Sequence, residues 1–247
     1  MKKRAVIIGA STGIGRAVAQ QLIREGYTVG LASRRLPLLQ AIQNQAPSPA
    51  DVFVQELDLR APEEARRRLE ALIEAMGGAD LVIVNAAVDV SNPDMRWEAS
   101  QEILAVNGVG FVAVCETALH LFLKQGHGHL AGVSSIAGIM SNGRAPVYSA
   151  SKAFVSQYLN NLRLKFHDKK IVITDLIPGF VATDMLKNRS QTFWMASPEK
   201  AAAQILKAIE QKKTHAFITG RWVWIVLLYR CLPGWLYRLL YRIAAPH

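Results

Sequence analysis

Tyr148 and Lys152 stand four residues apart in the segment Tyr148-Ser149-Ala150-Ser151-Lys152. On a helix this spacing places both side chains on the same face. A phenol has an ordinary pKa of about 10, and a neighbouring ammonium lowers that pKa towards neutral pH. The pair therefore predicts a tyrosine that exchanges protons with a substrate as a general acid and base. The alternative is an ordinary amphipathic helix without a catalytic role, because a two-residue pattern is weak evidence for a catalytic site.

Two serines precede this pair, in the segment Val133-Ser134-Ser135 at the end of a predicted strand. A hydroxyl group beside the tyrosine can hold a substrate oxygen and stabilise the charge that develops on it during reaction. We assign this role to Ser135.

A glycine-rich segment follows the first predicted strand, with the spacing GxxxGxG directly before a predicted helix. Glycines let the chain turn tightly and approach a pyrophosphate, and the free N–H groups at the helix start attract negative charge. The segment predicts a dinucleotide-binding loop, and the alternative is a turn without a ligand. The residues assigned to this loop are Gly9, Ser11, Thr12, Gly13, Ile14 and Gly15.

The second predicted strand ends in Ser33-Arg34-Arg35. An acidic residue here would bind the ribose 2′-hydroxyl of NAD, whereas an arginine can bind the 2′-phosphate of NADP. No acid is present, so the sequence favours NADP, with these three residues at its phosphate. Exposed arginines in a solvated loop are the alternative. Asp58, after the third strand, can accept a hydrogen bond from adenine or cap the helix that starts near Pro62.

The elements that must position these residues alternate along the chain, each short apolar run being followed by a stretch with helical periodicity. This pattern predicts a single α/β domain with a doubly wound parallel sheet of the Rossmann type, covered by helices on both faces. Such sheets bind ligands at the carboxyl ends of their strands. The predicted strands are 5–10, 28–33, 51–58, 80–87, 129–135 and 171–178, and the predicted helices are 15–25, 36–45, 62–75, 101–124 and 149–166.

In combination these motifs resemble the short, single-domain members of the short-chain dehydrogenase/reductase family. The resemblance covers about residues 4–210 and adds Pro178-Gly179 with Thr183 after the last predicted strand. It implies an enzyme that transfers a hydride between nicotinamide and a carbonyl or alcohol, with Tyr148 as acid/base. It also implies a homo-oligomer that uses the helices beginning near Gln101 and Ser149 as contact faces.

The resemblance implies further roles that the spacing alone does not assign. Asn107 completes the catalytic set by holding a water that links Lys152 to solvent, and its alternative is a helix kink satisfied by backbone hydrogen bonds. Ser135 rather than Ser134 is the matching serine, and Lys152 also binds the nicotinamide ribose beside Tyr148. The cofactor-binding residues that the family adds are Asn85, Ala86, Pro178, Gly179, Val181 and Thr183.

One motif departs from the family pattern. The Asn-Asn-Ala-Gly sequence that follows the fourth strand in the family reads Val84-Asn85-Ala86-Ala87 here. This motif is mainly structural and lies on the adenosine side, so the change bears on fine cofactor geometry and not on the chemistry.

By the same resemblance the substrate lies over the nicotinamide, between residues 88–97, 136–147 and 185–195. The apolar side chains of these segments predict a pocket for a hydrophobic ketone, aldehyde or alcohol. Each of them can equally belong to the ordinary core. The side chains in question are Ile139, Met140, Met185, Phe193 and Trp194.

Charge and cysteine content limit the remaining functions. The chain has 247 residues, is 51% hydrophobic and carries a net charge of +10. Cys115 and Cys231 provide no disulfide framework, and no cluster of cysteine and histidine indicates a metal site. The first apolar run ends at Gly9, too soon for a secretion signal, so we expect a cytoplasmic protein.

Residues 221–247 form an extension beyond the domain of residues 1–220. They carry four arginines and no acid, interleaved with aromatic residues and leucine. This mixture suits peripheral contact with an anionic membrane better than nucleic acid, and the apolar run 222–229 is too short to span a bilayer. The alternatives are that the extension docks on the domain, covers the substrate pocket or contacts another subunit. After Pro233 a helix is predicted with Leu236, Leu239, Leu240 and Ile243 on one face and Arg238 and Arg242 on the other.

Together these patterns predict an NADP(H)-dependent oxidoreductase with a small, apolar carbonyl or alcohol substrate. The competing class is a non-catalytic dinucleotide-binding sensor or scaffold, because a fold alone does not establish activity. Such a protein is expected to lose part of the catalytic set. Asn107, Ser135, Tyr148 and Lys152 are all present, which favours the enzyme.

Overall fold

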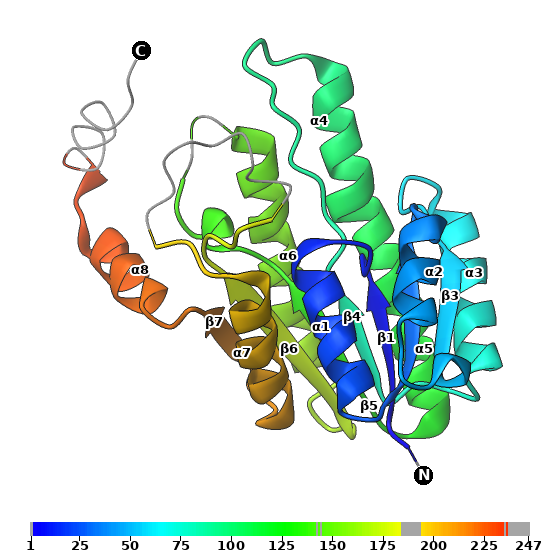
Figure 1. Cartoon of the computed structure of the whole chain (residues 1–247). Helices are drawn as coiled ribbons and strands as arrows, with labels where there is room; N and C mark the ends of the chain where they lie inside the picture. The colour runs from blue at the N-terminus through cyan, green and yellow to red at the C-terminus, as the bar shows by residue number, and fades with distance from the viewer. Residues whose placement is uncertain (1, 142, 144, 184–193, 235, 237–247) are drawn as a thin grey trace.

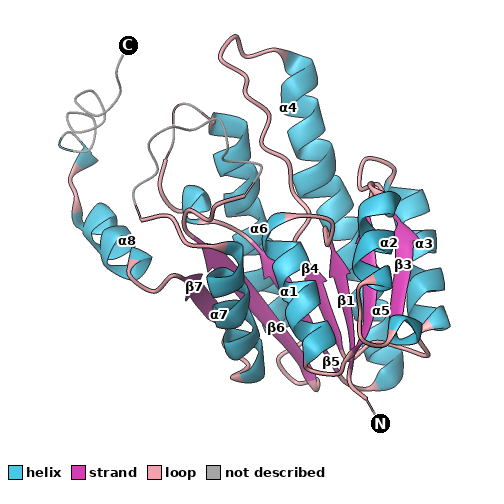
Figure 2. Ribbon diagram, in the orientation of Figure 1, coloured by secondary structure: helices cyan, strands magenta, loops and turns pink. Residues whose placement is uncertain are grey.

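A parallel sheet of seven strands forms the centre of the molecule, in the order β3-β2-β1-β4-β5-β6-β7 (Figures 1 and 2). This computed structural model describes residues 2–141, 143, 145–183, 194–234 and 236. The strand order reverses between β1 and β4, and a reversal of this kind opens a crevice for ligands at the carboxyl ends of the strands. The strands are β1 (Arg4–Ile8), β2 (Thr28–Ser33), β3 (Val52–Glu56), β4 (Leu81–Val84), β5 (Gly128–Val133), β6 (Ile171–Pro178) and β7 (His215–Ile218).

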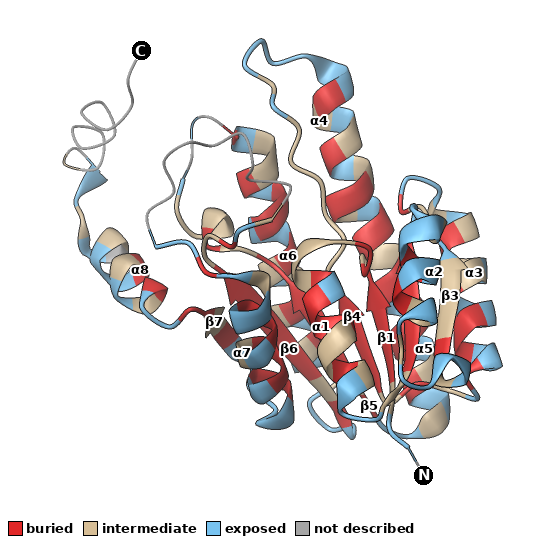
Figure 3. Ribbon diagram, viewed as in Figure 1, coloured by how far each residue is buried: buried red, intermediate tan, exposed pale blue. Residues whose placement is uncertain are grey.

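Helices cover both faces of this sheet, and each face has its own hydrophobic core. One core is formed with α1 (Gly13–Arg24), α2 (Leu36–Asn44) and α7 (Pro198–Glu210). The other is formed with α3 (Pro62–Ala75), α5 (Phe111–Gln125) and α6 (Pro146–Lys165). The central strands are buried along almost their whole length (Figure 3), because side chains on both faces meet a helix layer. The predicted doubly wound parallel sheet is confirmed.

The predicted elements are present, with shifts at their ends. The helix expected at 101–124 begins earlier and is formed by three consecutive parts: α4 (Trp97–Leu104), a π-helical turn (Ala105–Gly110) and α5. The periodicity of the sequence did not show α7 or β7. Strand β7 has only four residues, too few for a pattern to stand out.

The helix that runs through Trp97–Gln125 is the one helix in the described part of the chain that is long and apolar enough to cross a membrane. Most of its apolar window is buried inside the domain. Phe111 and Phe122 are fully buried there, facing α3, α6 and the sheet. The hydropathy of this segment is therefore explained by its place in the core.

The extension begins with a further helix, α8 (Trp222–Cys231), which follows β7 at the edge of the sheet (Figure 1). Trp222 and Val226 are almost completely buried and pack against Ile136 and Ile177 of the domain. The extension thus docks on the domain through this helix. Of the amphipathic helix predicted after Pro233, all the named side chains except Leu236 lie outside the described residues.

Candidate active site

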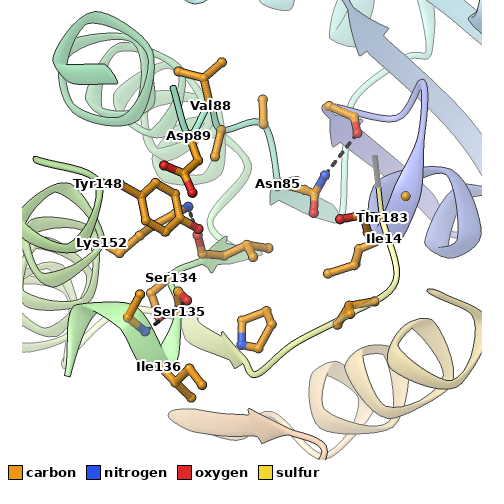
Figure 4. Close-up of a pocket in the computed structure, with 18 of the residues that line it drawn as sticks. Ile14, Asn85, Val88, Asp89, Ser134, Ser135, Ile136, Tyr148, Lys152 and Thr183 are labelled. Carbon is orange, nitrogen blue, oxygen red and sulfur yellow. Dashed lines mark hydrogen bonds between the residues drawn. The ribbon is translucent and has the colours of Figure 1, made fainter. Parts of the chain in front are cut away.

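A cavity of about 890 Å³ opens at the carboxyl ends of the strands, and residues from most of the sheet line it (Figure 4). Figure 4 shows Ser135, Tyr148 and Lys152 on one side of the cavity and Ile14, Asn85 and Thr183 on the other. Of the residues predicted for catalysis and cofactor binding, Gly15 and Asn107 are the two outside its lining. The predicted residues that line it are Gly9, Ser11, Thr12, Gly13, Ile14, Ser33, Arg34, Arg35, Asp58, Asn85, Ala86, Ser135, Tyr148, Lys152, Pro178, Gly179, Val181 and Thr183.

Helix α6 positions Tyr148 and Lys152 one turn apart on the face that points into the cavity. The helix starts with Pro146 in its first turn, where the missing N–H of a proline costs no hydrogen bond. The Lys152 ammonium lies 5.9 Å from the centre of the Tyr148 ring. The spacing of four residues therefore brings the two groups together at the cavity, as the sequence predicts.

Lys152 is buried, and its Nζ atom donates a hydrogen bond of 2.8 Å to the backbone carbonyl oxygen of Val133. Burial lowers the pKa of Lys152 to about 8, because the charged form loses contact with water. The negative charge of Asp175 opposes this effect and raises the pKa of Lys152. The lysine therefore changes its charge in a range where enzymes commonly work.

Asp175 is a residue that the sequence reading missed. It lies in β6, is completely buried, and its Oδ2 atom accepts a hydrogen bond of 2.5 Å from Ser156 Oγ. Ser156 follows Lys152 by one turn of α6. In the sequence, Asp175 is the one acidic residue within the apolar strand IVITDLIP. A buried carboxylate needs a hydrogen-bond donor or a cation beside it, and this requirement is the signal that could have identified Asp175.

The two neighbouring serines have different surroundings. Ser134 is buried and its hydroxyl donates to the backbone oxygen of Leu176 at 3.3 Å, so it faces the sheet. Ser135 is only half-buried, and its Oγ atom accepts a hydrogen bond of 3.1 Å from the backbone N–H of Ala137. That bond leaves the hydroxyl proton of Ser135 for a ligand in the cavity. The geometry supports Ser135, rather than Ser134, as the serine that holds a substrate oxygen.

Asn107 is buried in the π-helical turn between α4 and α5. Its side chain accepts from the N–H of Val88 and donates to the carbonyl oxygen of the same residue, both at 2.9 Å. A further bond of 3.1 Å runs from Nδ2 to Ser151 Oγ. Asn107 therefore ties the loop after β4 to helix α6, directly beside Lys152 in the chain. The alternative for this residue was a helix kink satisfied by backbone hydrogen bonds; the structure shows a π-helical turn, and here the side chain of Asn107 makes the bonds.

The glycine-rich loop packs directly on the end of β4. Asn85 Nδ2 donates to the backbone oxygen of Gly9 at 3.0 Å. A Cβ atom on Gly15 would lie 2.1 Å from that same oxygen, and one on Gly9 would lie 2.6 Å from the backbone nitrogen of Ala86. Gly9 also has a φ of +90°, which favours glycine. These glycines allow the close approach that holds the loop in place.

Arg35 connects the end of β2 to the glycine-rich loop. Its Nη2 atom donates to Ser11 Oγ at 2.9 Å and to Thr12 Oγ1 at 2.8 Å. Its backbone N–H donates to Ser33 Oγ at 3.2 Å, and Arg34 beside it is exposed to solvent. The two guanidinium groups therefore stand at the mouth of the cavity, where a phosphate can reach them.

Asp58 forms an ion pair with Arg60, whose Nη2 atom lies 2.5 Å from Asp58 Oδ2. The backbone N–H of Arg60 also donates to Asp58 Oδ1 at 3.0 Å. The N-cap of α3 is Ala61, so the capping alternative for Asp58 is wrong: its carboxylate closes a local turn instead. Asp58 still lines the cavity, next to Leu57 and Leu59.

Helix α8 forms one wall of the other end of the cavity. Its residues Trp222, Ile225, Leu228 and Tyr229 line the cavity together with Leu232. Apolar residues of the loops after β5 and β6, namely Ile136, Met140 and Phe180, also line the cavity and pack in one cluster with α8. Covering of the substrate pocket was one alternative for the extension; α8 lines the cavity, and the covering itself stays a prediction. Met185 and Phe193 lie outside the described residues.

Trp222 joins this wall to the segment after β6. Its ring packs so closely on Gly179 that a Cβ there would lie 2.0 Å from Trp222 Nε1, and it contacts Phe180 edge-on at 5.2 Å between ring centres. Trp194 packs edge-on against Trp222 at 6.3 Å and does not line the cavity. Ile139 lies beside the same cluster without lining the cavity, so it belongs to the core.

Residues 3–194 match the family model described as short chain dehydrogenase. The chain belongs to the short-chain dehydrogenase/reductase family. An uncharacterized oxidoreductase of Myxococcus xanthus is 37% identical over 187 residues, which cover 74% of each chain. The relatives of this family member are thus oxidoreductases.

Solved structures of short-chain dehydrogenases share the fold. One from Burkholderia phymatum, in complex with NAD, has a TM-score of 0.82 at 21% identity and covers 92% of each chain. Another from Sphingobium yanoikuyae, in complex with NADPH, has a TM-score of 0.80 at 18% identity and covers 94% of this chain and 97% of the other. These two structures show that this chain shares their fold, and they hold different nicotinamide cofactors.

Proposed function

We propose that this short-chain dehydrogenase/reductase transfers a hydride between NADP(H) and the carbonyl or alcohol group of an apolar substrate, with Tyr148 as general acid and base. One observation carries the proposal. Tyr148, Lys152 and Ser135 line the same cavity as the glycine-rich loop and Arg34 and Arg35. A proton donor and a dinucleotide site that share one cavity can act on the same substrate.

The residues around the cavity fit NADP. The N-terminus of α1 and the glycine-rich loop offer free N–H groups to a pyrophosphate. Ser33, Arg34 and Arg35 supply a hydroxyl group and two cations where an acid would select NAD. We assign Asp58 and Asn85 to the adenosine end, and the segment from Pro178 to Thr183 to the nicotinamide end.

The bound cofactor supplies or accepts a hydride at the carbon of the substrate. In the direction of reduction, Tyr148 donates its phenolic proton to the carbonyl oxygen, so that the oxygen becomes a hydroxyl group. The ammonium of Lys152 stabilises the phenolate that remains, and Ser135 donates a hydrogen bond to the same substrate oxygen. In oxidation the phenolate of Tyr148 takes the proton back.

Asn107 belongs to this machinery as a positioning residue. It holds Val88 at the cavity wall and Ser151 next to Lys152. In the proposed function the π-helical turn supplies a water that links Lys152 to solvent, so that the proton lost from Tyr148 is replaced.

The substrate end of the cavity offers mainly apolar contacts. Met140, Phe180, Trp222 and Ile225 line the cavity there, and the polar groups of the same lining include Ser135 and Tyr148, with Asp89 beside Tyr148 (Figure 4). A pocket of this composition favours a substrate whose carbonyl group is attached to hydrocarbon.

We also propose a homo-oligomer. Large apolar side chains are exposed on the helices that the family uses for contact: Leu104 in α4, Val109 in the π-helical turn and Phe154 in α6. Exposed apolar side chains grouped on neighbouring helices indicate an interface. Analytical ultracentrifugation of the wild type and of Phe154→Ser tests this, because a smaller species is expected for the variant.

We place the protein in the cytoplasm. Cys115 and Cys231 are both free thiols, and Cys231 is exposed to solvent. An exposed free thiol is typical of a reducing compartment. Fractionation of cells, followed by detection of the chain, tests this location.

Titration with NADPH and with NADH, followed by fluorescence, tests the cofactor. Arg34→Ala removes a guanidinium group from the proposed phosphate site, and we expect it to weaken NADPH binding about tenfold or more while NADH binding stays unchanged. Arg35→Ala also removes the bonds to Ser11 and Thr12 of the glycine-rich loop and should weaken the binding of both nucleotides, so the test of the 2′-phosphate rests on Arg34→Ala. Arg24→Ala, an exposed arginine at the far end of α1, is the matched control. Equal losses for both nucleotides in Arg34→Ala would contradict the assignment of the 2′-phosphate.

Turnover tests the chemistry. With a panel of apolar ketones and aldehydes, Tyr148→Phe should lose reduction by a factor of about 100 or more while it still binds NADPH. If the wild type binds NADPH but the panel shows no turnover that depends on Tyr148, the sensor or scaffold class replaces the enzyme.

A further inference from the structure

Helix α8 is apolar on two faces. The inner face, with Trp222, Ile225, Val226 and Tyr229, points to the domain and the cavity. The residues of the outer face follow the helical spacing i, i+3, i+4, i+7 and are all exposed. We call them the outer stripe: Trp224, Leu227, Leu228 and Cys231, with Trp224 75% and Leu228 64% exposed. A helix that is apolar all round is normally covered on all sides, so this stripe indicates a second binding surface.

The helix holds this stripe in a fixed position. Tyr229 Oη donates to Ser141 Oγ and accepts from the backbone N–H of the same residue, both at 3.2 Å. At the other end, Trp222 is locked against Gly179. Figure 3 shows α8 at the outer edge of the molecule with exposed residues on its free side. The stripe is thus presented to solvent by anchors at both ends of the helix.

The stripe lies beside the opening of the substrate end of the cavity. Leu228 belongs to both: it lines the cavity and is largely exposed. Ile225 of α8, Met140, Ser135 and Tyr148 line the same cavity. An apolar molecule that enters at Leu228 therefore meets hydrocarbon along its path to the catalytic groups.

Charge selects among the occupants that an apolar stripe can have. Residues 221–247 contain four arginines and no acid, and Arg221 stands directly before α8. Lipid surfaces that carry negative charge attract such residues, and tryptophan favours the boundary between lipid and water. A two-fold contact with a second copy would bring the same arginines of both copies together, which repel each other.

We propose that the outer stripe of α8 docks this enzyme on an anionic lipid surface, with the opening of the cavity facing the lipid. The stripe enters the apolar boundary of the bilayer, and the arginines contact the headgroups. A substrate with a long hydrocarbon chain then passes from the lipid into the cavity beside Leu228. The docking itself does not depend on the chemistry, whereas this entry of substrate rests on the proposed function.

Flotation of the full-length protein with vesicles tests the docking. We expect binding to vesicles of phosphatidylcholine mixed with phosphatidylserine, and weaker binding to pure phosphatidylcholine or at high salt. The double variant Trp224→Ser/Leu227→Ser removes apolar surface that neither lines the cavity nor packs on the domain. Its binding should fall about tenfold or more, since each buried side chain of this size contributes about 1.5–3 kcal/mol. Leu164→Ser, a 74% exposed leucine in α6, is the matched control and should bind as the wild type does.

The outcomes separate the proposals. Absence of wild-type binding to the anionic vesicles, or equal binding of the double variant, overturns the docking. A wild-type assembly in solution that the double variant breaks, without lipid binding, replaces the lipid by a second copy. NADPH titration of the same samples reports on the proposed function alone. Lipid binding without NADPH binding overturns only the proposed enzymatic function. NADPH binding without lipid binding overturns only the proposed docking.

Discussion

The Nζ atom of Lys152 donates to the carbonyl oxygen of Val133 at 2.8 Å, so the strand that leads into Ser135 also holds the lysine. The register of β5 and the start of α6 are thereby coupled. A shift of either element would move the proton donor and the serine relative to each other, and a fixed geometry of this kind is what positioned catalysis requires.

The buried charge of Lys152 makes stability depend on pH. Its pKa is about 8 in the folded protein and 10.5 in its ordinary state. Between these values the unfolded chain binds a proton that the folded protein has lost, so the free energy of unfolding rises with pH across this window. Below about pH 8, Lys152 is charged in the folded protein as well, and the full free-energy cost of burying this charge lowers the stability. Lys152→Met should therefore be more stable than the wild type at pH 7, and the difference should shrink by on the order of 3 kcal/mol towards pH 10.5. Urea unfolding across this range measures it, and a difference independent of pH would contradict the assignment.

Asp175→Asn should lower the pKa of Lys152, because the negative charge that favours the ammonium is lost. The alkaline limb of kcat/KM for NADPH is then expected to move to lower pH. Burial lowers the pKa values of Arg163 and His215 and the charge of Asp175 raises them, so this variant should lower both of these pKa values further as well. Ser156→Ala keeps the charge and removes only the hydrogen bond, so its limb should move less. An identical limb for Asp175→Asn and the wild type would show that Asp175 does not act on the lysine.

Gly15→Ala should weaken both the fold and nucleotide binding. The added Cβ atom would lie 2.1 Å from the Gly9 carbonyl oxygen and 2.7 Å from Asn85 Nδ2, and the backbone has no room to move away. We expect a loss of stability of about 1–3 kcal/mol and weaker NADPH binding. Gly220→Ala, where no atom lies near the added Cβ, is the control for thermal unfolding and titration. Unchanged NADPH binding in Gly15→Ala would mean that the loop does not approach the nucleotide as proposed.

Gly179 and Trp222 should be coupled in a double-mutant cycle. Gly179→Ala alone places a methyl group inside the indole ring of Trp222 and should displace α8, raising KM for an apolar carbonyl. In a Trp222→Ala background the added methyl group has room, so Gly179→Ala should change the free energy of unfolding only slightly. The two effects are therefore expected to differ from additivity by about 0.5–3 kcal/mol in urea unfolding. Additive effects would show that the helix is not held by this contact.

Local patterns predicted the parts of the site that depend on local geometry. The GxxxGxG loop and the pair Tyr148 and Lys152 each follow from spacing along one turn or one helix, and both line the cavity. Ser135 needed the family resemblance in addition, because its neighbour Ser134 has the same chemistry in sequence and only the structure shows Ser134 bonded to Leu176.

Long-range packing determined the parts that the sequence did not show. Asp175 gains its influence on Lys152 from the pairing of β6 with β5, which no local period records. The π-helical turn at Asn107 arises where its side chain bonds to Val88. The wall made by α8 depends on a contact between Trp222 and Gly179, far apart in the chain. Asp58 was predicted to bind adenine or to cap a helix, and the structure shows its carboxylate in an ion pair with Arg60.

Different stretches of the chain build the two halves of the cavity. Strands β1 to β6 and their loops supply the half proposed for the nucleotide, whereas α8, beyond the 3–194 region shared with the family model, supplies a wall of the other half. Mutations at Ile225 or Leu232 can therefore accumulate without touching the groups that move protons. Under the proposed function, substitutions in α8 would change the range of substrates and leave the chemistry at Tyr148 and Lys152 as it is.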